Sequence, residues 1–593
     1  MSVGKYVVSE RILVGVAWPY ANGPLHLGQI AGAYLPADIF ARYHRVKGNE
    51  VLMVSGSDQH GTPITIRAEQ EGKEPDEIAG KYHRQFLDSW QKLGISFDLF
   101  TTTGTTNHAE VTQDIFLTLL NKGYIYKSTT SQAFCPKCQR FLPDRYVEGT
   151  CPYCYSPNAR GDQCEACSKP MNTDELIDAH CRICGTTPVF NDSEHFFLKL
   201  SAFEDKLAAW VEEQGQWRPN VANLTRRYLK EGLRDRAITR DIGWGVPVPV
   251  DGFEDKRIYV WFEAVIGYLS ASKEWARSTG DSEKWRSFWQ GEAKGYYFIG
   301  KDNIPFHTLF WPAMLMGYSD DLTLPHDIPA NEFLTIEGRK LSTSQNWAVW
   351  LPDYLSRYDP DPLRYLLSIN MPETGDTDFS WREFVRRNND ELVATYGNLV
   401  NRVLTFTYRN FDGCVPEHSK YNKIREYLDL NGDLGTTNIL GDHAGFIRSD
   451  ALIEDAKELL RELGTGENSL LPNCKFKQAI MKAMSFAHEA NRYLDQKEPW
   501  KVIKEDRQAA ADSLYVALYV ISCLKTALYP FLPFSSKKVH EYLGFDGKVE
   551  DYGWQPTVPE PGRKLLFPQP LFTKLDKALA DEETSRVGHV QYE

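Results

Sequence analysis

The side chains best suited to chemistry are eight cysteines between residues 135 and 184. They form four Cys-x-x-Cys pairs: Cys135/Cys138, Cys151/Cys154, Cys164/Cys167 and Cys181/Cys184. Thiolates at this spacing are typical of tetrahedral zinc sites, and eight thiolates fill two of them. A redox function would use one pair at a thioredoxin-like helix and leave the others unexplained. The sequence therefore predicts two structural zinc sites, and the spacing leaves open which pairs share a metal.

A second group of candidate residues lies in the turn Pro19-Tyr20-Ala21-Asn22-Gly23-Pro24-Leu25-His26-Leu27-Gly28-Gln29. A helical pattern begins where the turn ends, and the free N–H groups and dipole of a helix start favour phosphate. Gly23 and Gly28 allow the backbone to approach a ligand closely. His26 and Gln29 are three residues apart, so both side chains can point to one ligand. The turn therefore predicts a nucleotide-phosphate site.

These residues must be positioned by a parallel sheet. The apolar run Ile12–Ala17 predicts a buried strand, residues 30–47 a helix, and Val51–Val54 a second strand. Strand, helix and strand in this order form a βαβ unit, which implies parallel pairing. The runs Ile258–Phe262 and Gly295–Ile299 are expected to be further strands of the same sheet.

The fold class is therefore expected to be α/β: a Rossmann-like parallel-sheet domain with a zinc-binding insertion, followed by an all-α domain. After about residue 385, apolar residues recur at helical spacing. The predicted order is residues 1–122, first half of the sheet domain; 123–235, the insertion; 236–330, second half; 331–385, a linking region; 386–560, the helical domain; and 561–593, a C-terminal tail whose polar residues 573–593 are expected to fray.

Composition excludes some classes of protein. The net charge of -13 argues against indiscriminate coating of DNA or RNA, which needs a broad basic surface. Local basic runs remain available to an RNA partner. Residues 1–8 lack the apolar core of a signal peptide, and Leu514–Leu524 is too short to span a bilayer. A cytoplasmic protein without DNA or membrane partners is expected.

Two motifs give the chain a resemblance to class I aminoacyl-tRNA synthetases. Their first motif, named HIGH, matches the turn that ends at Gln29. Their second, named KMSKS, matches Gly338-Arg339-Lys340-Leu341-Ser342-Thr343-Ser344. The resemblance implies that both motifs bind one ATP with its Mg²⁺. The residues implied in ATP binding and catalysis are Gly23, His26, Gly28, Gln29, Arg339, Lys340, Ser342 and Thr343.

Each motif departs from the family pattern at one charged position. Gln29 stands where the family usually has histidine, and Thr343 stands where it usually has a second lysine. That lysine stabilises the departing pyrophosphate, so here the positive charge has to come from Lys340, Arg339 or Mg²⁺. Two hypotheses follow: an active enzyme with variant motifs, and a non-catalytic tRNA-binding paralogue.

Within the class, the chain is similar to methionyl-tRNA synthetases along nearly its whole length. The matching strings are Ser57–Pro63, Thr239–Asp241, Tyr259–Tyr268 and Phe298–Asp302 with its continuation to Ala313. Methionine is apolar with a polarizable sulfur, so an aromatic pocket with a polar group near the sulfur suits it. The resemblance implies a methionine site formed by Trp18, Tyr20, Asp58, Arg240, Trp261, Ala264, Tyr268, Asp302, Phe306, His307 and Trp311.

The resemblance also implies roles for these residues. The rings of Trp261, Tyr268, Phe306 and Trp311 would form the wall, Tyr20 and His307 would reach the sulfur, and an Arg240–Asp302 pair would order the floor. Asp58 would bind the α-ammonium group, and its place after a predicted strand supports this because such strand ends face the ligand crevice. Trp18 and Val265 differ from the Leu and Pro of bacterial relatives.

The family resemblance bears on the cysteines and on the choice of amino acid. It implies nested pairs: Cys151, Cys154, Cys164 and Cys167 on one zinc, and Cys135, Cys138, Cys181 and Cys184 on the other. Residues 123–190 are too few for the hydrolytic editing domain of the isoleucine, valine and leucine enzymes. A synthetase for another amino acid, such as cysteine, is the remaining alternative, and the aromatic pocket argues against it.

The helical domain is expected to bind the tRNA anticodon. Asn398, Arg402, Pro499 and Trp500 match the family's anticodon contacts, and Asn398 and Arg402 share a helix face. Unpaired RNA bases stack on aromatic rings, so Trp500 is the expected stacking partner. The resemblance thus implies a methionine–tRNA ligase with ATP, L-methionine and tRNA(Met) as partners. A monomer is expected because no dimer-forming C-terminal domain is recognised.

Overall fold

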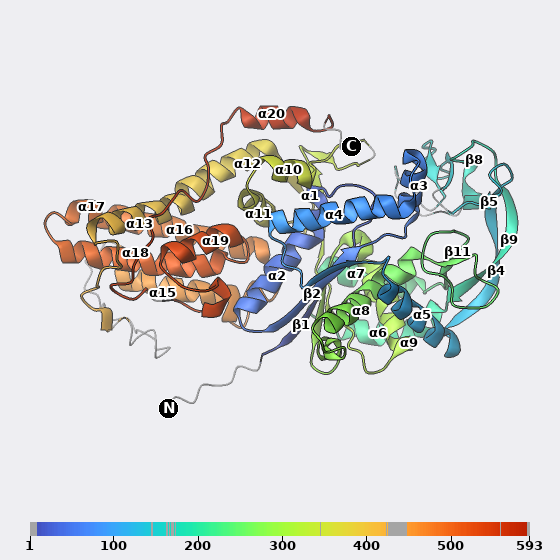
Figure 1. The fold of residues 1–593 in the computed structure, drawn as a ribbon, viewed down its shortest axis with the longest axis horizontal. Helices are drawn as coiled ribbons and strands as arrows, with labels where there is room; N and C mark the ends of the chain where they lie inside the picture. Colours follow the sequence, from blue (N-terminus) through green and yellow to red (C-terminus); the bar gives the residue numbers. More distant parts are fainter. Residues whose placement is uncertain are drawn as a thin grey trace.

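The computed structural model describes residues 9–143, 146–161, 164, 166–167, 171, 173–343, 345–422, 424, 447–557 and 559–589. Ser344 of the second motif therefore lies outside the described residues, as does most of the irregular stretch 412–449. The chain forms three parts in a row: a helical part, a central sheet with its helices, and an insertion at the far end (Figure 1).

The central sheet is parallel and positions the predicted nucleotide turn. Its strand order is β14 (Pro325–Asp327), β13 (Lys294–Gly300), β1 (Arg11–Val16), β2 (Glu50–Ser57) and β3 (Leu99–Thr102), and β15 (Ala330–Asn331) also pairs with β13. All these pairings are parallel. The strands predicted at Ile12–Ala17, Val51–Val54 and Gly295–Ile299 are confirmed.

Alternating side chains of β1 face two separate hydrophobic clusters. Ile12, Val14 and Val16 pack with η1 (Ile30–Tyr34), α2 (Leu35–Val46) and α4 (Pro75–Leu93). Leu13 packs on the opposite face with α5 (Thr106–Asn121), α8 (Val260–Ser278) and α9 (Trp311–Tyr318). Because a strand's side chains alternate between faces, a strand buried on both sides has to be apolar throughout. The helix predicted for residues 30–47 is confirmed as η1 and α2.

The prediction of a strand at Ile258–Phe262 is wrong. Only β12 (Arg257–Ile258) is a strand, and it pairs antiparallel with β11 (Thr239–Arg240), outside the main sheet. Extended Tyr259 caps α8, which begins at Val260. A short apolar run reads alike as a buried strand and as the first turn of a buried helix, and α8 is largely buried.

The cysteine-rich insertion is built on a long antiparallel ribbon. β4 (Ile125–Cys135) pairs with β9 (Val189–Leu198) from Ile125↔Leu198 to Phe134↔Val189. Short strands β6 (Val147–Thr150), β7 (Ala159–Arg160) and β8 (Ile177–Cys181) form a small sheet beyond it. The ribbon lies at the end of the molecule farthest from the helical part (Figure 1).

The second motif sits on a small sheet that follows the main one. β16 (Leu334–Ile336) pairs antiparallel with β17 (Arg339–Lys340) and parallel with β18 (Thr377–Phe379). Two helices, α10 (Leu351–Arg357) and α11 (Pro360–Ile369), separate β17 from β18. Gly338, at a φ of 72°, makes the tight turn before Arg339 that L-residues rarely adopt.

The remaining chain is helical, as predicted. It contains α12 (Trp381–Arg387), η8 (Asn388–Gly397), α13 (Asn398–Asn410), α15 (Ser449–Leu460), α16 (Phe476–Lys497), α17 (Pro499–Val502), α18 (Arg507–Leu528) and α19 (Pro533–Tyr542). Within the described residues, α18 alone is long and apolar enough to cross a membrane. Its most apolar window is 89% buried inside the protein, as expected for the central helix of a packed bundle.

A buried arginine joins the sheet domain to the helical part. Arg364 on α11 is fully buried and donates to Asp38 Oδ2 of α2 at 2.7 Å. It also donates to the carbonyls of Phe531 and Pro530, which lie between α18 and α19. Arg42 binds Asp38 as well, and the two arginines hold the pKa of Asp38 at about 2 although burial alone would raise it.

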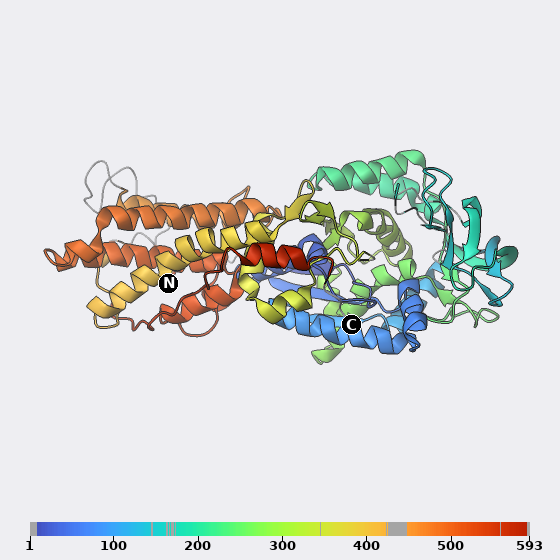
Figure 2. The same cartoon turned by 90° about the horizontal axis from the view of Figure 1, so that it is seen from above.

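The prediction that residues 573–593 fray is wrong for the described part of this segment. α20 (Leu579–Arg586) packs along α12 (Figures 1 and 2). Glu583 is buried and bonded to Arg357 and Tyr358 at the end of α10. This polar segment therefore packs against the protein and buries the carboxylate of Glu583. We call α20 the strap.

Candidate functional site

His26 and Gln29 cap the helix that opens after β1. The Nδ1 atom of His26 accepts from the backbone N–H of Gln29 at 3.3 Å, and Oε1 of Gln29 accepts from the backbone N–H of His26 at 3.0 Å. Burial lowers the pKa of His26 to about 4, so its ring is neutral. Because Nδ1 accepts a hydrogen bond, Nε2 carries the ring proton and can donate to a phosphate.

The first motif is joined to the segment that follows the second motif. His26 forms an antiparallel bridge with Trp350, and the N–H of Leu27 donates to the carbonyl of Val349 at 3.1 Å. A Cβ atom added to Gly28 would lie 3.1 Å from Leu341 of the second motif. Gly28 therefore packs closely against the second motif, which the sequence places over 300 residues away, and a side chain there would require Leu341 to shift.

The cationic groups of the second motif lie on an exposed turn. The guanidinium of Arg339 lies over the Trp347 ring at 3.9 Å, and Lys340 Nζ lies 5.9 Å from the Phe333 ring. Ser342 forms a backbone bridge with Trp347, and Thr343 lies in the turn between them. Lys340 is exposed, so its ammonium group can turn toward a bound phosphate.

Asp58 lies at the carboxyl end of β2, beside the first motif. Its backbone pairs with Tyr20: the N–H of Asp58 donates to the carbonyl of Pro19, and the N–H of Ala21 donates to the carbonyl of Asp58. The side chain is buried, and burial together with the charge of Glu263 raises its pKa to about 8. An incoming ammonium group would supply the positive partner that this carboxyl group needs.

Aromatic side chains from α8 and from the segment after β13 contact one another. Tyr268 donates its hydroxyl proton to Nε2 of His307 at 2.8 Å, because Nδ1 of His307 donates to the carbonyl of Asn303 at 2.9 Å. Burial lowers the pKa of His307 to about 4, so the ring is neutral. The rings of Trp261 and Phe306 meet edge to face at 5.1 Å.

Three further predicted residues occupy different surroundings. Trp18 packs against two glycines: a Cβ atom would lie 2.3 Å from its ring at Gly56 and 2.6 Å at Gly267. The two glycines therefore make room for the tryptophan that stands in place of Leu. Trp311 is fully buried in the core, with its indole N–H on the Tyr297 hydroxyl at 3.3 Å. Ala264 lies half-buried on α8, one turn after Val260.

Arg240 and Asp302 each have other neighbours among the described contacts. Arg240 donates to the carbonyls of Ala237 and Thr239, and its guanidinium lies 3.9 Å from the centre of the Tyr259 ring. Burial raises the pKa of Asp302, against the charges of Lys301 and Lys340. Asp302 lines a cavity of about 310 Å³ with residues of α7 (Pro219–Glu231).

Sequence reasoning missed a set of polar residues behind Asp58. Glu263 of α8 is fully buried and accepts from Nδ1 of His60 at 3.1 Å. His108 of α5 lies on the other side of the same carboxylate. Both His60 and Glu263 occur in the strings that carry the resemblance, but only the fold brings them together, since 203 residues separate them.

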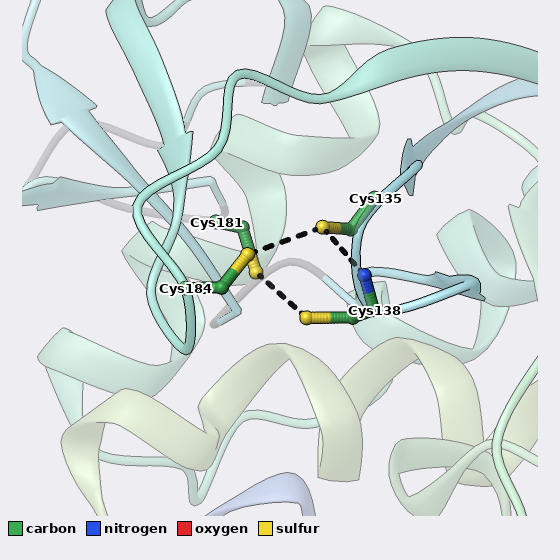
Figure 3. Close-up of side chains that lie close together, drawn as sticks. All are labelled: Cys135, Cys138, Cys181 and Cys184. Carbon is green, nitrogen blue, oxygen red and sulfur yellow. Dashed lines mark hydrogen bonds between the residues drawn. The ribbon is translucent and has the colours of Figure 1, made fainter.

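The cysteines form two clusters in the nested arrangement. Cys135 and Cys138 at the end of β4 face Cys181 and Cys184 after β8, with Sγ–Sγ distances of 3.4 Å (Cys135–Cys184) and 4.0 Å (Cys138–Cys181) (Figure 3). Cys151, Cys154, Cys164 and Cys167 form the second cluster, again with all Sγ atoms within 4.8 Å. Zn–S bonds of about 2.3 Å at tetrahedral angles place sulfurs about 3.8 Å apart, so both clusters fit a metal of that kind.

The predicted anticodon residues meet at one end of the helical part. The guanidinium of Arg402 on α13 lies 4.6 Å from the centre of the Trp500 ring on α17 and binds Asp495 at 2.9 Å. Pro499 is the first residue of α17, and Glu498 turns the chain there with a φ of 41°. Asn398 is one helical turn before Arg402, so the side chains of Asn398, Arg402 and Trp500 lie on one surface.

Comparison with known proteins places this arrangement in a class. A family model described as "tRNA synthetases class I (M)" matches residues 12–404, and one described as "Anticodon binding domain of methionyl tRNA ligase" matches residues 445–591. The fold and the two joined motifs are therefore those of a class I tRNA synthetase.

Individual relatives narrow the class. A methionine–tRNA ligase of Dehalococcoides mccartyi is 59% identical over 98% of this chain and 100% of its own length, and one of Thermomicrobium roseum is 50% identical over 98% and 99%. The structure of Mycobacterium tuberculosis methionyl-tRNA synthetase with methionyl-adenylate superposes with a TM-score of 0.75 at 25% identity, over 95% of this chain and 99% of that one. The chain belongs to the methionine–tRNA ligase family.

Proposed function

We propose that this protein activates L-methionine with ATP to methionyl-adenylate and then transfers the methionyl group to the 3′ end of tRNA(Met). In the first step the methionine carboxylate attacks the α-phosphorus of ATP and pyrophosphate leaves. In the second, the terminal adenosine hydroxyl of tRNA attacks the carbonyl and AMP leaves. The observation that carries the proposal is the joining of His26 to Trp350, because it brings both motifs to the edge of the sheet where Asp58 lies.

The two motifs would hold ATP by positioning and charge. Gly23 and Gly28 let the backbone approach the nucleotide, and the Nε2–H of neutral His26 would donate to a phosphate oxygen. Lys340 and Arg339 would neutralise the pyrophosphate, with Ser342 and Thr343 adding hydroxyl donors. Mg²⁺ bound with ATP supplies further positive charge to the phosphates.

Gln29 is a reason to expect activity rather than its loss. Its side chain closes the reciprocal cap with His26, a task that needs an acceptor and no charge. The Gln29 side chain therefore still satisfies the backbone N–H of His26, while its backbone N–H donates to Nδ1 and leaves the ring proton on Nε2. Thr343 lies in a turn next to exposed Lys340, so the loss of the second lysine leaves one mobile ammonium group beside the phosphates.

The methionine pocket would combine Asp58 with the aromatic residues. Asp58 would receive the α-ammonium group, and the ordered Tyr268–His307 pair would present polar atoms toward the sulfur. Trp261, 41% exposed at the pocket rim, would close on the thioether with Phe306. Tyr20, Trp18 and Ala264 would line the remaining sides, and Arg240, Asp302 and Trp311 would support the pocket from behind.

We further propose that both cysteine clusters bind Zn²⁺. Four sulfurs per cluster leave no open ligand position, so the metals would stabilise the insertion rather than take part in catalysis. Asn398, Arg402, Pro499 and Trp500 would contact the anticodon, with Trp500 stacking on a base. The protein is proposed to act as a cytoplasmic monomer.

Methionine-dependent exchange of pyrophosphate with ATP tests the proposal. The expected result is exchange with L-methionine, and at most weak exchange with the other amino acids of a full panel. Absence of exchange with every amino acid, with tRNA binding intact, would establish the non-catalytic paralogue instead. Exchange with a different amino acid, such as cysteine, would reassign the pocket.

A further inference from the structure

A buried group of titratable side chains lies directly behind Asp58. The backbone N–H of His60 donates to Oδ1 of Asp58 at 3.2 Å. The ring of the same histidine places Nδ1 3.1 Å from both carboxylate oxygens of Glu263. Asp58 is 2% exposed and Glu263 is 0% exposed, so water cannot screen either carboxyl group. His60 thus stands between two buried acids that come from different elements.

The other groups around His60 are few. His108 from α5 places Nε2 3.6 Å from Oε2 of Glu263 and is held by Ser270 through Nδ1 at 2.9 Å. The Trp244 ring meets the His60 ring edge-on at 5.5 Å. Tyr20 packs against Gly61, next to His60. Among the described residues, the titratable groups placed near His60 by these contacts are Asp58, Glu263, His108 and the phenol of Tyr20.

The net charge of Asp58, His60 and Glu263 suits the binding of one cation. Burial alone would lower the pKa of His60, but the carboxylates of Glu263 and Asp58 raise it, which favours a proton on the ring. The charge of His60, with hydrogen bonds from His108 and His60, lowers the pKa of Glu263 against the effect of burial. Protonated His60 and ionised Glu263 cancel, which leaves Asp58 as the single negative charge that an ammonium group can neutralise.

We propose that His60 and Glu263 are positioning residues that set the charge of the amino-acid site. The imidazolium of His60 neutralises Glu263, so that Asp58 alone meets the α-ammonium group of the substrate. The inference rests on the proposed function, in which Asp58 holds that group. Neither His60 nor Glu263 touches the substrate; both act through Asp58.

Single substitutions should have unequal effects. His60→Gln removes the cation and leaves two buried carboxyl groups that share a proton, so Asp58 is harder to ionise. The KM for methionine is expected to rise about tenfold or more at pH 7, with the KM for ATP nearly unchanged. Glu263→Gln removes one acid, and His60 then gives up its proton, so the KM for methionine should change by only about threefold or less.

The double variant distinguishes an effect of charge balance from a general disruption of the methionine site. In His60→Gln/Glu263→Gln, Asp58 is again the single charge, so the KM for methionine should return to within about threefold of Glu263→Gln alone. His44→Gln, which alters a buried histidine of α2 that pairs with Asn49, is the matched control and should leave both KM values unchanged. Losses that add in the double variant, or a parallel rise in the KM for ATP, would overturn the proposal.

Binding of 4-(methylthio)butanoate, a methionine lacking the ammonium group, gives a readout independent of catalysis. His60→Gln should weaken binding of methionine and leave binding of this analogue unchanged; equal weakening of both would overturn the proposal. Thermal unfolding of each variant identifies those that fail to fold, and Glu263→Gln still tests the idea if His60→Gln is unstable. Failure of the proposed function would differ, since the unmodified protein would then show no methionine-dependent exchange.

Discussion

At the scale of single residues, the groups proposed to meet ATP and methionine differ in protonation. His26 lacks its second ring proton, whereas Asp58 tends to hold a proton. Burial keeps His26 neutral, so its Nε2–H group can donate a hydrogen bond to phosphate while the ring carries no charge. Asp58 is pushed toward its neutral form by burial and by Glu263, so that it becomes ionised most readily when an ammonium group arrives. Each side chain is tuned by an environment that the fold creates.

The pH dependence of methionine binding follows from Asp58. Its pKa is raised to about 8, so below that pH the free protein holds a proton there that the ammonium group must displace. The KM for methionine is therefore expected to fall as the pH rises from about 6 to about 8, by up to about tenfold per unit. Pyrophosphate exchange at saturating ATP measures it, with the KM for ATP as the control. A constant KM for methionine across this range would contradict the assignment.

Two substitutions of Gln29 separate the effect of its helix cap from the effect of a charge at this position. Gln29→Ala removes the acceptor for the His26 N–H and is expected to lower the free energy of unfolding by about 1 kcal/mol and to slow adenylate formation. Gln29→Glu keeps the acceptor, so stability should be retained, but its negative charge beside the phosphates should raise the KM for ATP. Thermal unfolding and the kinetics of pyrophosphate exchange, measured on both variants, distinguish the two effects. Equal behaviour of the two variants would mean that the cap is not what matters.

The sequence singled out candidate site residues that lie inside local motifs, and it missed partners that are distant in the chain. His26, Gly28, Lys340 and Asp58 were recognised because each sits in a recognisable string. The pairing of His60 with Glu263 was not, because neither residue type is unusual where it stands and periodicity carries no information about contacts between separate elements. The roles assigned to the pocket residues stay predictions until they are measured.

At the scale of elements, the ribbon of β4 and β9 explains how the cysteines pair. Cys135 ends β4 just beyond the Phe134–Val189 pair, so the outer cysteine pairs meet at the far end of the ribbon, and the inner pairs form a second cluster within the segment between them. The sequence of this region predicted metal sites well, because thiol spacing is a local signal. It did not predict the ribbon, whose strands alternate weakly and are exposed along much of their length.

Zinc content tests the nested pairing directly. Cys151→Ser/Cys164→Ser alters one cluster only, so the purified variant should retain about one of two zinc ions per chain. Cys135→Ser/Cys151→Ser alters both clusters and should lose both ions. Metal analysis of the two proteins provides the measurement. The opposite ranking would mean that sequential pairs share a metal.

The contact between α13 and α17 leads to a prediction for tRNA. Trp500→Ala removes the ring under Arg402 and the proposed stacking surface, so tRNA charging should fall strongly while methionine-dependent exchange changes little. Stacking on one base is worth about 1–3 kcal/mol, which corresponds to a loss of roughly 5- to 150-fold in charging efficiency. Met481→Ala, an exposed apolar residue on α16, is the control. An equal loss in both reactions would sink the assignment.

At the scale of the whole molecule, the sheet domain and the helical part are joined by buried charge. Arg364 and Asp38 are both fully buried, and the arginine also holds two carbonyls of the helical part. Breaking a buried ion pair leaves an uncompensated charge and costs about 3–5 kcal/mol. The helical part is thus held at a fixed orientation, which suits a molecule that must hold an anticodon at one end and the tRNA 3′ end at the other.

The strap at α20 predicts an effect far from the pocket. Glu583 binds Arg357 and Tyr358, and its neighbour Thr584 donates to Glu337 beside the second motif at 3.2 Å. Glu583→Gln should weaken this attachment, lower the rate of adenylate formation several-fold, and leave the KM for methionine unchanged. Glu582→Gln, on the exposed side of α20, is the matched control. An unchanged rate in Glu583→Gln would show that the strap is only a covering segment.

The strap has a consequence for the order in which the protein matures. Asn346 and Trp347, beside the second motif, contact Gly588, so this part of the chain gains the contact only after about 240 further residues have been made. The first motif and the pocket can assemble as soon as residue 350 has left the ribosome, but the loop between them gains this support only some 240 residues later. During its own translation the chain would therefore hold a nearly complete site in which the second motif does not yet have the contact with Gly588.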